Sequence, residues 1–195
     1  IGGAVLVLGP RSTWAADTAM GKDDFFFVQL SDTHWGFSDP KINPDFAGTL
    51  KKAIAAVNGM AAQPDFVVFT GDITHTTDDP KERRKRMAEA RDIISSLKVK
   101  NVKFLAGEHD AGQDNGEAFR EYFGKTYYTF DHKGVHFIVI DNVSDPTSSI
   151  TDPQLAWLDG ETLDRRIARE GALPLDEVVS LLSPVAAAIA HAHAQ

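Results

Sequence analysis

Three short apolar segments alternate with amphipathic stretches in the first half of the chain. The apolar segments cover 25–30, 66–69 and 102–105, and each is continuous, as in strands that are buried on both faces. Between them, over 44–60 and 80–97, apolar residues recur at helical spacing. Strands that alternate with helices predict a layered α/β domain with a partly parallel sheet.

The segment after the third apolar run predicts a short helix and a hairpin. Asn115 stands where the N-cap of a helix over 116–123 is expected. Two further strands, over 127–131 and 135–140, flank a Lys-Gly dipeptide and are expected to pair with each other. This part of the chain therefore adds a second, hairpin-like unit to the alternating strands and helices.

The chain changes character after about residue 159. A helix over 152–158 continues the domain, but no buried strand of the earlier kind follows it. Residues 174–193 instead form an Ala-, Leu- and Val-rich helical pattern that Pro184 interrupts. An α/β domain that begins in this way normally continues with more strands. The expected division is an N-terminal tail over 1–22, an α/β half-domain over 23–158 and a helical tail over 159–195.

The first residues resemble a processing signal. A short apolar run over 1–8 is broken by Pro10, and the stretch 12–17 resembles a signal-peptidase site. The preferred interpretation is a partial export signal, with a mature protein that begins near Ala16 or Asp17 and is exported to the periplasm. The alternative is a disordered N-terminal tail. The run is too short to span a membrane, and no other segment is long and apolar enough to do so.

Composition and charge narrow the function classes. The 195 residues are 43% hydrophobic and 25% charged, as in an ordinary soluble globular domain. The chain has no cysteine, which excludes disulfides, thiolate metal sites and cysteine nucleophiles. A net charge of −8 argues against a nucleic-acid partner. An acidic protein that acts on anionic phosphate esters needs a local positive charge, and bound metal ions are the usual source.

A polar cluster follows each of the three apolar segments. The carboxyl ends of parallel strands meet at one edge of a sheet, so the clusters are expected to converge there. Carboxylate and imidazole groups suit Zn, Mn and Fe ions. Each cluster alone is a weak signal, but the occurrence of all three at successive strand ends is a strong one. The clusters are Asp32-Thr33-His34, Gly71-Asp72 and Gly107-Glu108-His109-Asp110.

The spacing within these clusters suggests how they hold metal. Asp32 and His34 are two residues apart, so a turn at the strand end can aim both side chains inward. Asp72 lies on a neighbouring strand and has two oxygens with which to bridge two ions, and Glu108 is a fourth candidate ligand. The glycines that precede Asp72 and Glu108 permit backbone geometry that a side chain would hinder.

These clusters resemble those of the metallophosphoesterase (calcineurin-like) family, whose members carry D-x-H, G-D-x-x and G-N-H-D at successive strand ends. The similarity covers about 25–158 and implies a layered α/β metallophosphoesterase-type fold, truncated to its N-terminal half and followed by a helical C-terminal tail. The implied roles are metal ligands and groups that assist the leaving group. The implied metal ligands are Asp32 and His34 for the first ion, Asp72 as the bridge and Glu108 for the second ion. The implied catalytic residues are His109, which would lie near the substrate, and Asp110, which would orient His109.

The resemblance also implies an activity and its cofactors. Two divalent ions (Mn, Fe or Zn) would activate a hydroxide that attacks the phosphorus of a small-molecule phosphate ester. Two departures from the family pattern bear on this activity. Glu108 replaces the family's Asn, and the later Gly-His-x-His ligands are missing. His191 and His193 copy only the His-x-His spacing, within a helical pattern. The alternative function is a non-catalytic metal-binding or interaction fragment.

Four further features of the sequence have an interpretation. Residues 168–195 resemble the helix before the catalytic loop of bacterial serine/threonine kinases, without implying kinase activity. His75 occupies the position of a metal-binding tyrosine in the purple acid phosphatase subgroup; an extra ligand, a hydrogen-bond donor to a ligand and a solvated loop histidine are the alternatives. The basic cluster 83–86 is interpreted as a solvated helix face. Asp141-Asn142 is interpreted as a turn at the end of a strand, with contact to the substrate as the alternative.

Overall fold

The computed structural model of the chain describes residues 24–160, and a parallel three-stranded sheet lies at its centre. The strands are β1 (Phe27–Leu30), β2 (Phe66–Phe69) and β3 (Val102–Phe104), with β2 in the middle. Phe27 pairs with Phe66, and Phe69 pairs with Phe104. The predicted α/β class and parallel pairing are confirmed, and the carboxyl ends of all three strands lie at one edge of the sheet.

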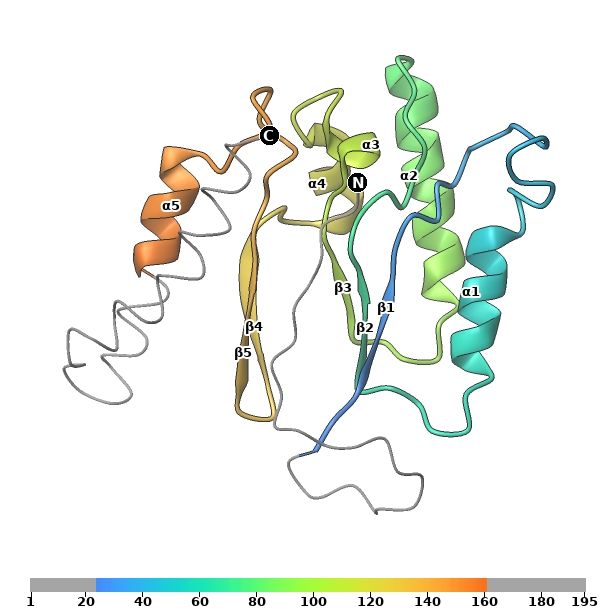
Figure 1. The fold of residues 1–195 in the computed structure, drawn as a ribbon, viewed down its shortest axis with the longest axis horizontal. Coiled ribbons are helices and arrows are strands. Elements are labelled where there is room, and N and C mark those ends of the chain that lie inside the picture. The colour runs from blue at the N-terminus through green and yellow to red at the C-terminus, as the bar shows by residue number, and fades with distance from the viewer. Residues whose placement is uncertain (1–23, 161–195) are drawn as a thin grey trace.

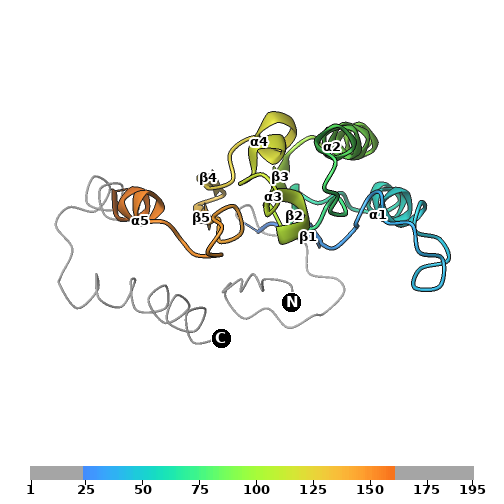
Figure 2. The same ribbon diagram turned by 90° about the horizontal axis from the view of Figure 1, so that it is seen from above.

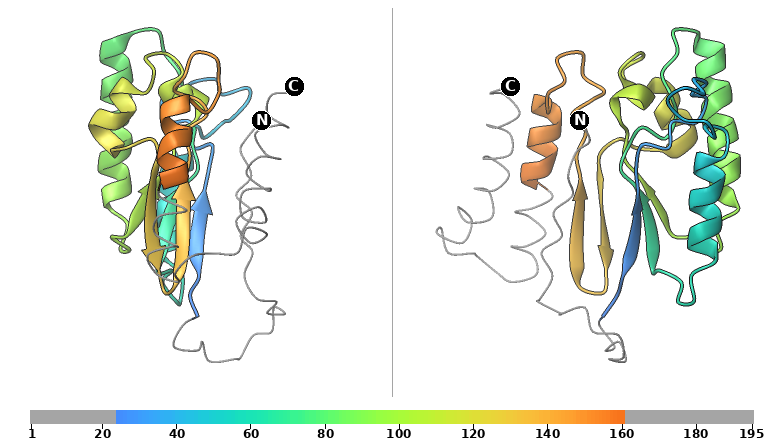
Figure 3. Two further views of the ribbon diagram at one scale, coloured as in Figure 1. Left: turned by 90° about the vertical axis from the view of Figure 1, so that its left-hand side faces the viewer. Right: turned by 45° about the vertical axis from the view of Figure 1, so that its right-hand side comes forward.

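Two helices cover one face of this sheet (Figures 1 and 2). They are α1 (Thr49–Asn58) and α2 (Pro80–Ser95). The N-cap of α2 is Asp79, whose side chain accepts hydrogen bonds from the backbone N–H groups of Lys81 and Glu82. Figure 3 shows both helices on the same side of the strands. The apolar side chains between sheet and helices form the main core, which includes Leu50, Ile54, Val67, Phe69, Met87 and Ile94.

A hairpin packs against the sheet through aromatic side chains. It consists of β4 (Tyr128–His132) and β5 (Val135–Val139), which pair antiparallel as predicted but form a sheet of their own. The ring of Phe66 lies 5.5 Å from that of Phe130 and 5.4 Å from that of Phe137. Since Val67 and Phe69 point into the helix-side core, Phe66 points to the opposite face, and the hairpin contacts that face.

Helix α5 (Asp152–Asp159) lies beside the hairpin (Figure 1). Its Gln154 side chain exchanges hydrogen bonds with the backbone N–H and carbonyl of Asp141, at 2.6 and 2.7 Å. The carboxylate of Asp141 accepts hydrogen bonds from the N–H groups of Val143 and Ser144, each at 3.0 Å. The interpretation of Asp141 as a turn residue is therefore confirmed.

The structure corrects the prediction between 105 and 123. A four-residue helix, α3 (Glu108–Ala111), was not predicted because it is too short to show helical periodicity. Helix α4 (Glu117–Phe123) begins after Gly116, which has φ 75°. Asn115 is itself left-handed, with φ 53°, so its predicted role as N-cap is wrong. Asp114 takes over part of that role, since its carboxylate accepts a hydrogen bond from the N–H of Ala118 at 3.1 Å.

Several predictions concern residues that the structure does not describe. These are the export stretch, most of the helical tail, and His191 and His193. Among residues 24–160, no helix combines the length and the apolar character that crossing a bilayer requires.

Candidate metal centre

Three of the predicted ligands share an uncommon backbone conformation. Asp32, His34 and Asp72 have φ angles of 57°, 43° and 49°. Few residues other than glycine adopt this left-handed region, and each such residue costs about 1–3 kcal/mol, so the surrounding structure must hold it there. All three residues lie in the loops that follow β1 and β2, in agreement with the predicted convergence at the sheet edge.

Hydrogen bonds between the two loops hold this conformation. Beyond the ends of β1 and β2, the N–H of Asp32 donates to the carbonyl of Gly71 (3.1 Å) and that of His34 to the carbonyl of Asp72 (2.9 Å). The N–H of Trp35 continues the series to the carbonyl of Ile73 at 2.8 Å. The pairing of the two strands thus persists into the loops, and it fixes the ligands on one loop relative to those on the other.

Asp32, His34 and Asp72 form a first group of metal-ligand type. Their donor atoms lie within 4.8 Å of one another. The Nε2 atom of His34 lies 3.9 Å from Oδ1 of Asp32 and 3.8 Å from Oδ2 of Asp72. Two carboxylates and one imidazole are a donor set that suits Mn, Fe or Zn ions, so these residues fit a divalent cation.

A second group shares Asp72 with the first. It contains Asp72, Glu108 and His109, whose donor atoms also lie within 4.8 Å of one another. The Oδ1 atom of Asp72 accepts a hydrogen bond from the N–H of His109 at 3.1 Å, which joins the loop after β2 to helix α3. Asp72 belongs to both groups, which is the arrangement expected of a carboxylate that bridges two ions.

Close backbone contact at Gly107 makes this arrangement possible. A Cβ atom at Gly107 would lie 2.1 Å from Oδ1 of Asp72 and 2.3 Å from its backbone nitrogen. A Cβ atom at Gly71 would lie 2.9 Å from Cα of Gly107. All three distances are below van der Waals contact, which confirms the expectation that these two glycines permit backbone geometry that a side chain would hinder.

The ring of His109 is oriented by the loop after β2. The backbone N–H of Thr76 donates to Nδ1 of His109 at 3.2 Å. Because Nδ1 accepts this hydrogen bond, the neutral ring carries its proton on Nε2. The Nε2–H group is then the hydrogen-bond donor that His109 can present to a bound molecule.

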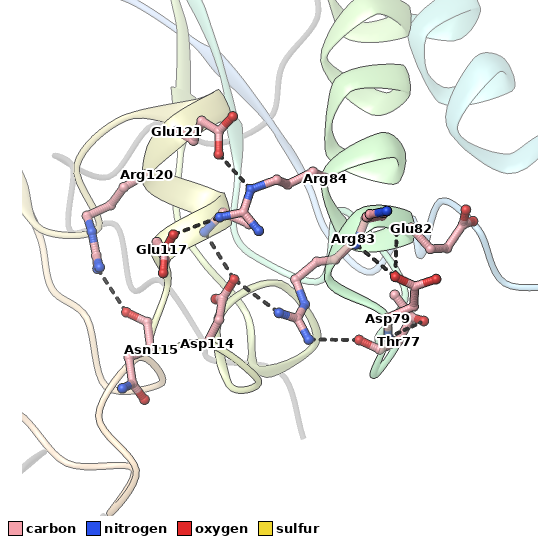
Figure 4. A network of polar contacts seen from close by, with 12 residues as sticks. Thr77, Asp79, Glu82, Arg83, Arg84, Asp114, Asn115, Glu117, Arg120 and Glu121 are labelled. Atoms are coloured by element: carbon pink, nitrogen blue, oxygen red, sulfur yellow. Dashed lines mark hydrogen bonds and ion pairs between the residues drawn. The ribbon is translucent and has the colours of Figure 1, made fainter.

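Two arginines of α2 hold the same loop from the other side. Arg86 Nη1 donates to the carbonyls of His75 and Thr76, at 3.0 and 3.1 Å. Arg83 Nη2 donates to the carbonyl of Thr77 at 2.9 Å. Figure 4 shows Arg83 between Thr77 and the side chain of Asp114, to which it is bonded at 3.2 Å.

The interpretation of the basic cluster as a solvated face is therefore wrong for Arg83 and Arg86. Only 8% of the Arg83 side chain and 17% of the Arg86 side chain are exposed, whereas Lys85 is 61% exposed. Arg84 bonds to Glu117 and Glu121 on α4 (Figure 4). Apart from Glu82, which pairs with Arg86 along α2, the partners of these arginines lie outside the helix, and spacing along the helix does not indicate them.

The resemblance implies that Asp110 orients His109, but the hydrogen-bond partners of its carboxylate are Ile73, Thr74 and Gly107. Asp110 is 1% exposed, and its carboxylate accepts hydrogen bonds from the N–H groups of Ile73, Thr74 and Gly107 and from the Thr74 hydroxyl. It therefore joins the loop after β2, which carries Asp72, to the segment at Gly107 that leads into α3, while Thr76 holds the His109 ring. Burial raises the pKa of Asp110 to about 6, against hydrogen bonds from Thr74, Gly107 and Ile73 that favour the ionised form.

His75 lies in the centre rather than in solvent. Its ring stacks on that of His109 at 4.9 Å and lies edge-on to those of His34, at 5.4 Å, and Phe37, at 5.1 Å. Burial, together with the charges of His109, His34 and Arg86, lowers the pKa of His75, so the ring is predominantly neutral at pH 7. The solvated-loop interpretation of His75 is wrong. The useful signal was its position three residues after Asp72, on a loop paired with the loop that carries His34.

Comparison with known proteins assigns the chain that carries this centre to a family. The sequence profile of the calcineurin-like phosphoesterases matches residues 27–195. The chain belongs to the calcineurin-like phosphoesterase family. This finding agrees with the resemblance of the three strand-end clusters and with the α/β fold.

Curated relatives of the family are similar to this chain over part of their length. The mouse serine/threonine-protein phosphatase CPPED1 is 27% identical over 139 residues, which cover 62% of this chain and 44% of the mouse protein. Its zebrafish (Danio rerio) counterpart is 25% identical over 133 residues, or 60% of this chain and 43% of that protein. The chain thus spans less than half the length of these relatives.

A solved structure of a protein of unknown function from Aquifex aeolicus is 24% identical, with a TM-score of 0.35 over 73% of this chain and 71% of that one. This overlap is too low to support the fold or the function. The family assignment therefore depends on the sequence profile.

Proposed function

We propose that this centre hydrolyses phosphate esters with the help of two divalent metal ions. The observation that carries the proposal is the place of Asp72, whose carboxylate belongs to both ligand groups. Asp32 and His34 would hold the first ion with Asp72. Glu108 would hold the second ion with Asp72, in the place of the family's asparagine. The metals would be Mn, Fe or Zn, because the donors are carboxylates and imidazoles.

The bound ions would supply positive charge for the phosphoryl oxygens and lower the pKa of water. The chain's own residues would do the rest. His109, with its proton on Nε2, would donate a hydrogen bond to the leaving-group oxygen and stabilise the charge that develops there. Asp110 would keep the loops that carry Asp72 and His109 in place through its four hydrogen bonds.

Phosphate monoesters are the first substrate class to test. The relatives are named serine/threonine-protein phosphatases, and enzymes of that name act on phosphomonoesters of amino-acid side chains. The net charge of −8 gives no electrostatic attraction for nucleic acid. We therefore propose a small phosphate ester or a phosphorylated side chain as the substrate, bound through the metal ions.

Hydrolysis of p-nitrophenyl phosphate and bis-p-nitrophenyl phosphate by the purified chain tests the proposal. The assay is run with Mn²⁺, Zn²⁺ or Fe²⁺, and with EDTA. Asp72→Asn keeps the hydrogen bond from the His109 N–H and removes the charge. Asp92→Asn makes the same chemical change on an exposed part of α2 and is the matched control.

We expect metal-dependent turnover that Asp72→Asn reduces by on the order of 10³-fold and Asp92→Asn leaves unchanged. Turnover that survives EDTA, or that Asp72→Asn does not reduce, would contradict the proposal. Metal binding by a folded chain with no turnover under any metal would also contradict it. That last result would favour a non-catalytic metal-binding fragment instead.

A further inference from the structure

Three histidine rings meet in the centre, and each comes from a different part of the chain. His34 follows β1, His75 follows β2, and His109 lies in α3. Their donor nitrogens form a third group within 4.8 Å of one another, and this group contains no carboxylate. The ring of His109 lies 4.7 Å from that of His34 and 4.9 Å from that of His75.

The spacing of two of these nitrogens is that of ligands to one ion. Nδ1 of His34 and Nδ1 of His75 are 3.5 Å apart. Hydrogen bonds with an N–H donor are usually 2.7–3.2 Å long, so this pair is too far apart for a strong one. Two imidazole nitrogens at about 2.0–2.1 Å from a tetrahedral Zn²⁺ lie roughly 3.4 Å from each other. The observed distance matches the second case.

The third ring also has a nitrogen to offer. Nδ1 of His109 accepts a hydrogen bond from the Thr76 N–H in the tautomer that carries the proton on Nε2. To bind an ion through Nε2 the ring would take the other tautomer, with the proton on Nδ1, and would give up this hydrogen bond. The loop that carries His75 is anchored by the two hydrogen bonds that Arg86 donates to the carbonyls of His75 and Thr76. A site on a loop held in this way binds without a large ordering cost.

We propose that His34, His75 and His109 form an all-imidazole binding site for a borderline divalent cation such as Zn²⁺ or Co²⁺. Imidazole donors favour Zn, Co, Ni and Cu, whereas Mg, Ca and Mn prefer oxygen. The site therefore selects cations by a different chemistry from that of the two carboxylate-containing groups. It adds His75 to the metal chemistry of the centre and does not depend on hydrolysis.

His34 belongs to both kinds of site through different atoms. Its Nε2 faces Asp32 and Asp72, whereas its Nδ1 faces His75. A neutral imidazole has one nitrogen lone pair free for a metal, so an ion at the three-histidine site and an ion at the first group compete for this ring. The new site is therefore measured cleanly only where the carboxylates have been neutralised.

The test is a calorimetric titration of Zn²⁺ into the metal-stripped full chain that carries Asp32→Asn and Asp72→Asn. His191 and His193 are replaced by alanine in the same background, so that their imidazoles do not contribute. We expect one Zn²⁺ per chain to bind and Mn²⁺ not to bind measurably. Co²⁺ should give the visible absorption of a nitrogen-coordinated ion.

Adding His75→Ala to this background should weaken Zn²⁺ binding by on the order of 100-fold, because one of three ligands is lost. His136→Ala removes a histidine of β5 that is not in the three-histidine group, and it should leave Zn²⁺ affinity within about threefold. Circular dichroism checks that each variant is folded. If the background binds no Zn²⁺, or if His75→Ala weakens it no more than His136→Ala does, the proposal is overturned. These outcomes hold whether or not the chain hydrolyses phosphate esters.

Discussion

Strand β2 and the loop that follows it lie in very different surroundings. The β2 side chains Val67 and Phe69 are fully buried in the core beneath α1 and α2. Both residues take part in the regular parallel pairing of β2 with β1 and β3. A few residues later, Asp72 has a left-handed backbone and carries a charged side chain between two loops. In the core, apolar burial supplies stability without strain. At the sheet edge, hydrogen bonds and glycines hold polar groups in a conformation that they would not adopt alone.

This difference implies that the two regions respond differently to mutation. Changes in the core should lower the free energy of unfolding and leave the centre intact in every folded molecule. Changes at the sheet edge should impair metal binding by more than their effect on stability would suggest, because functional sites hold strain that the rest of the fold compensates.

The largest effect on stability is expected in the core, at Ile94. Ile94→Ala removes a side chain that is 1% exposed, and we expect the free energy of unfolding to fall by about 4 kcal/mol. Metal affinity per folded molecule should not change. Urea unfolding and a metal titration measure the two quantities. A loss of metal affinity in the folded variant would contradict the expectation that core changes affect stability alone.

A glycine at the sheet edge should show the opposite pattern. Gly107→Ala places a Cβ 2.1 Å from the Asp72 carboxylate, so Asp72 must move. We expect a loss of roughly 3 kcal/mol in stability and, in molecules that remain folded, a loss of metal binding. Gly160→Ala is the control, since its Cβ would meet nothing within 4 Å. Unimpaired metal binding by Gly107→Ala would show that the close contact is not needed.

The buried carboxyl of Asp110 should make stability depend on pH. Its folded-state pKa of about 6 is above the ordinary value of 3.8, so the folded chain holds the proton more tightly than the unfolded chain. This contribution is fully present below pH 3.8 and is lost as pH rises towards 6, with a total on the order of 3 kcal/mol.

Asp110→Asn cannot ionise and should lack this fall. Melting temperatures of the metal-stripped wild type and variant, taken between pH 4 and 7, measure the difference. If the gap between the two curves stays constant over this range, the pKa of Asp110 is not raised by burial.

The arginines of α2 distinguish a buried ion pair from an exposed one. Arg83→Met breaks the bond to Asp114 and the bond to the Thr77 carbonyl, and should cost about 2 kcal/mol because it leaves a largely buried carboxylate unpaired. Lys85→Met removes exposed pairs with Glu82 and Glu89 and should cost less than about 0.5 kcal/mol. Thermal unfolding compares the two, and equal effects would contradict the burial of Arg83.

The parts that sequence predicted well are those with a local signal. Continuous apolar runs located β1, β2 and β3, and the polar residues that follow them located Asp32, His34 and Asp72 at one edge. The errors concern contacts between distant segments. Arg83 is buried because Asp114, 31 residues away, neutralises it. His75 lies in the centre because its loop pairs with that of His34, 41 residues earlier. Neither partner can be identified from spacing along the chain.

The central claim is that the sheet edge holds divalent cations through Asp72. A calorimetric titration of Mn²⁺ into the metal-stripped chain tests it most directly, with Asp72→Asn beside Asp92→Asn. Mn²⁺ favours oxygen donors and so reports on the carboxylate groups rather than on the three histidines. The account predicts that Asp92→Asn binds Mn²⁺ like the wild type and that Asp72→Asn binds at least about 100-fold more weakly. Equal binding by the two variants would contradict it.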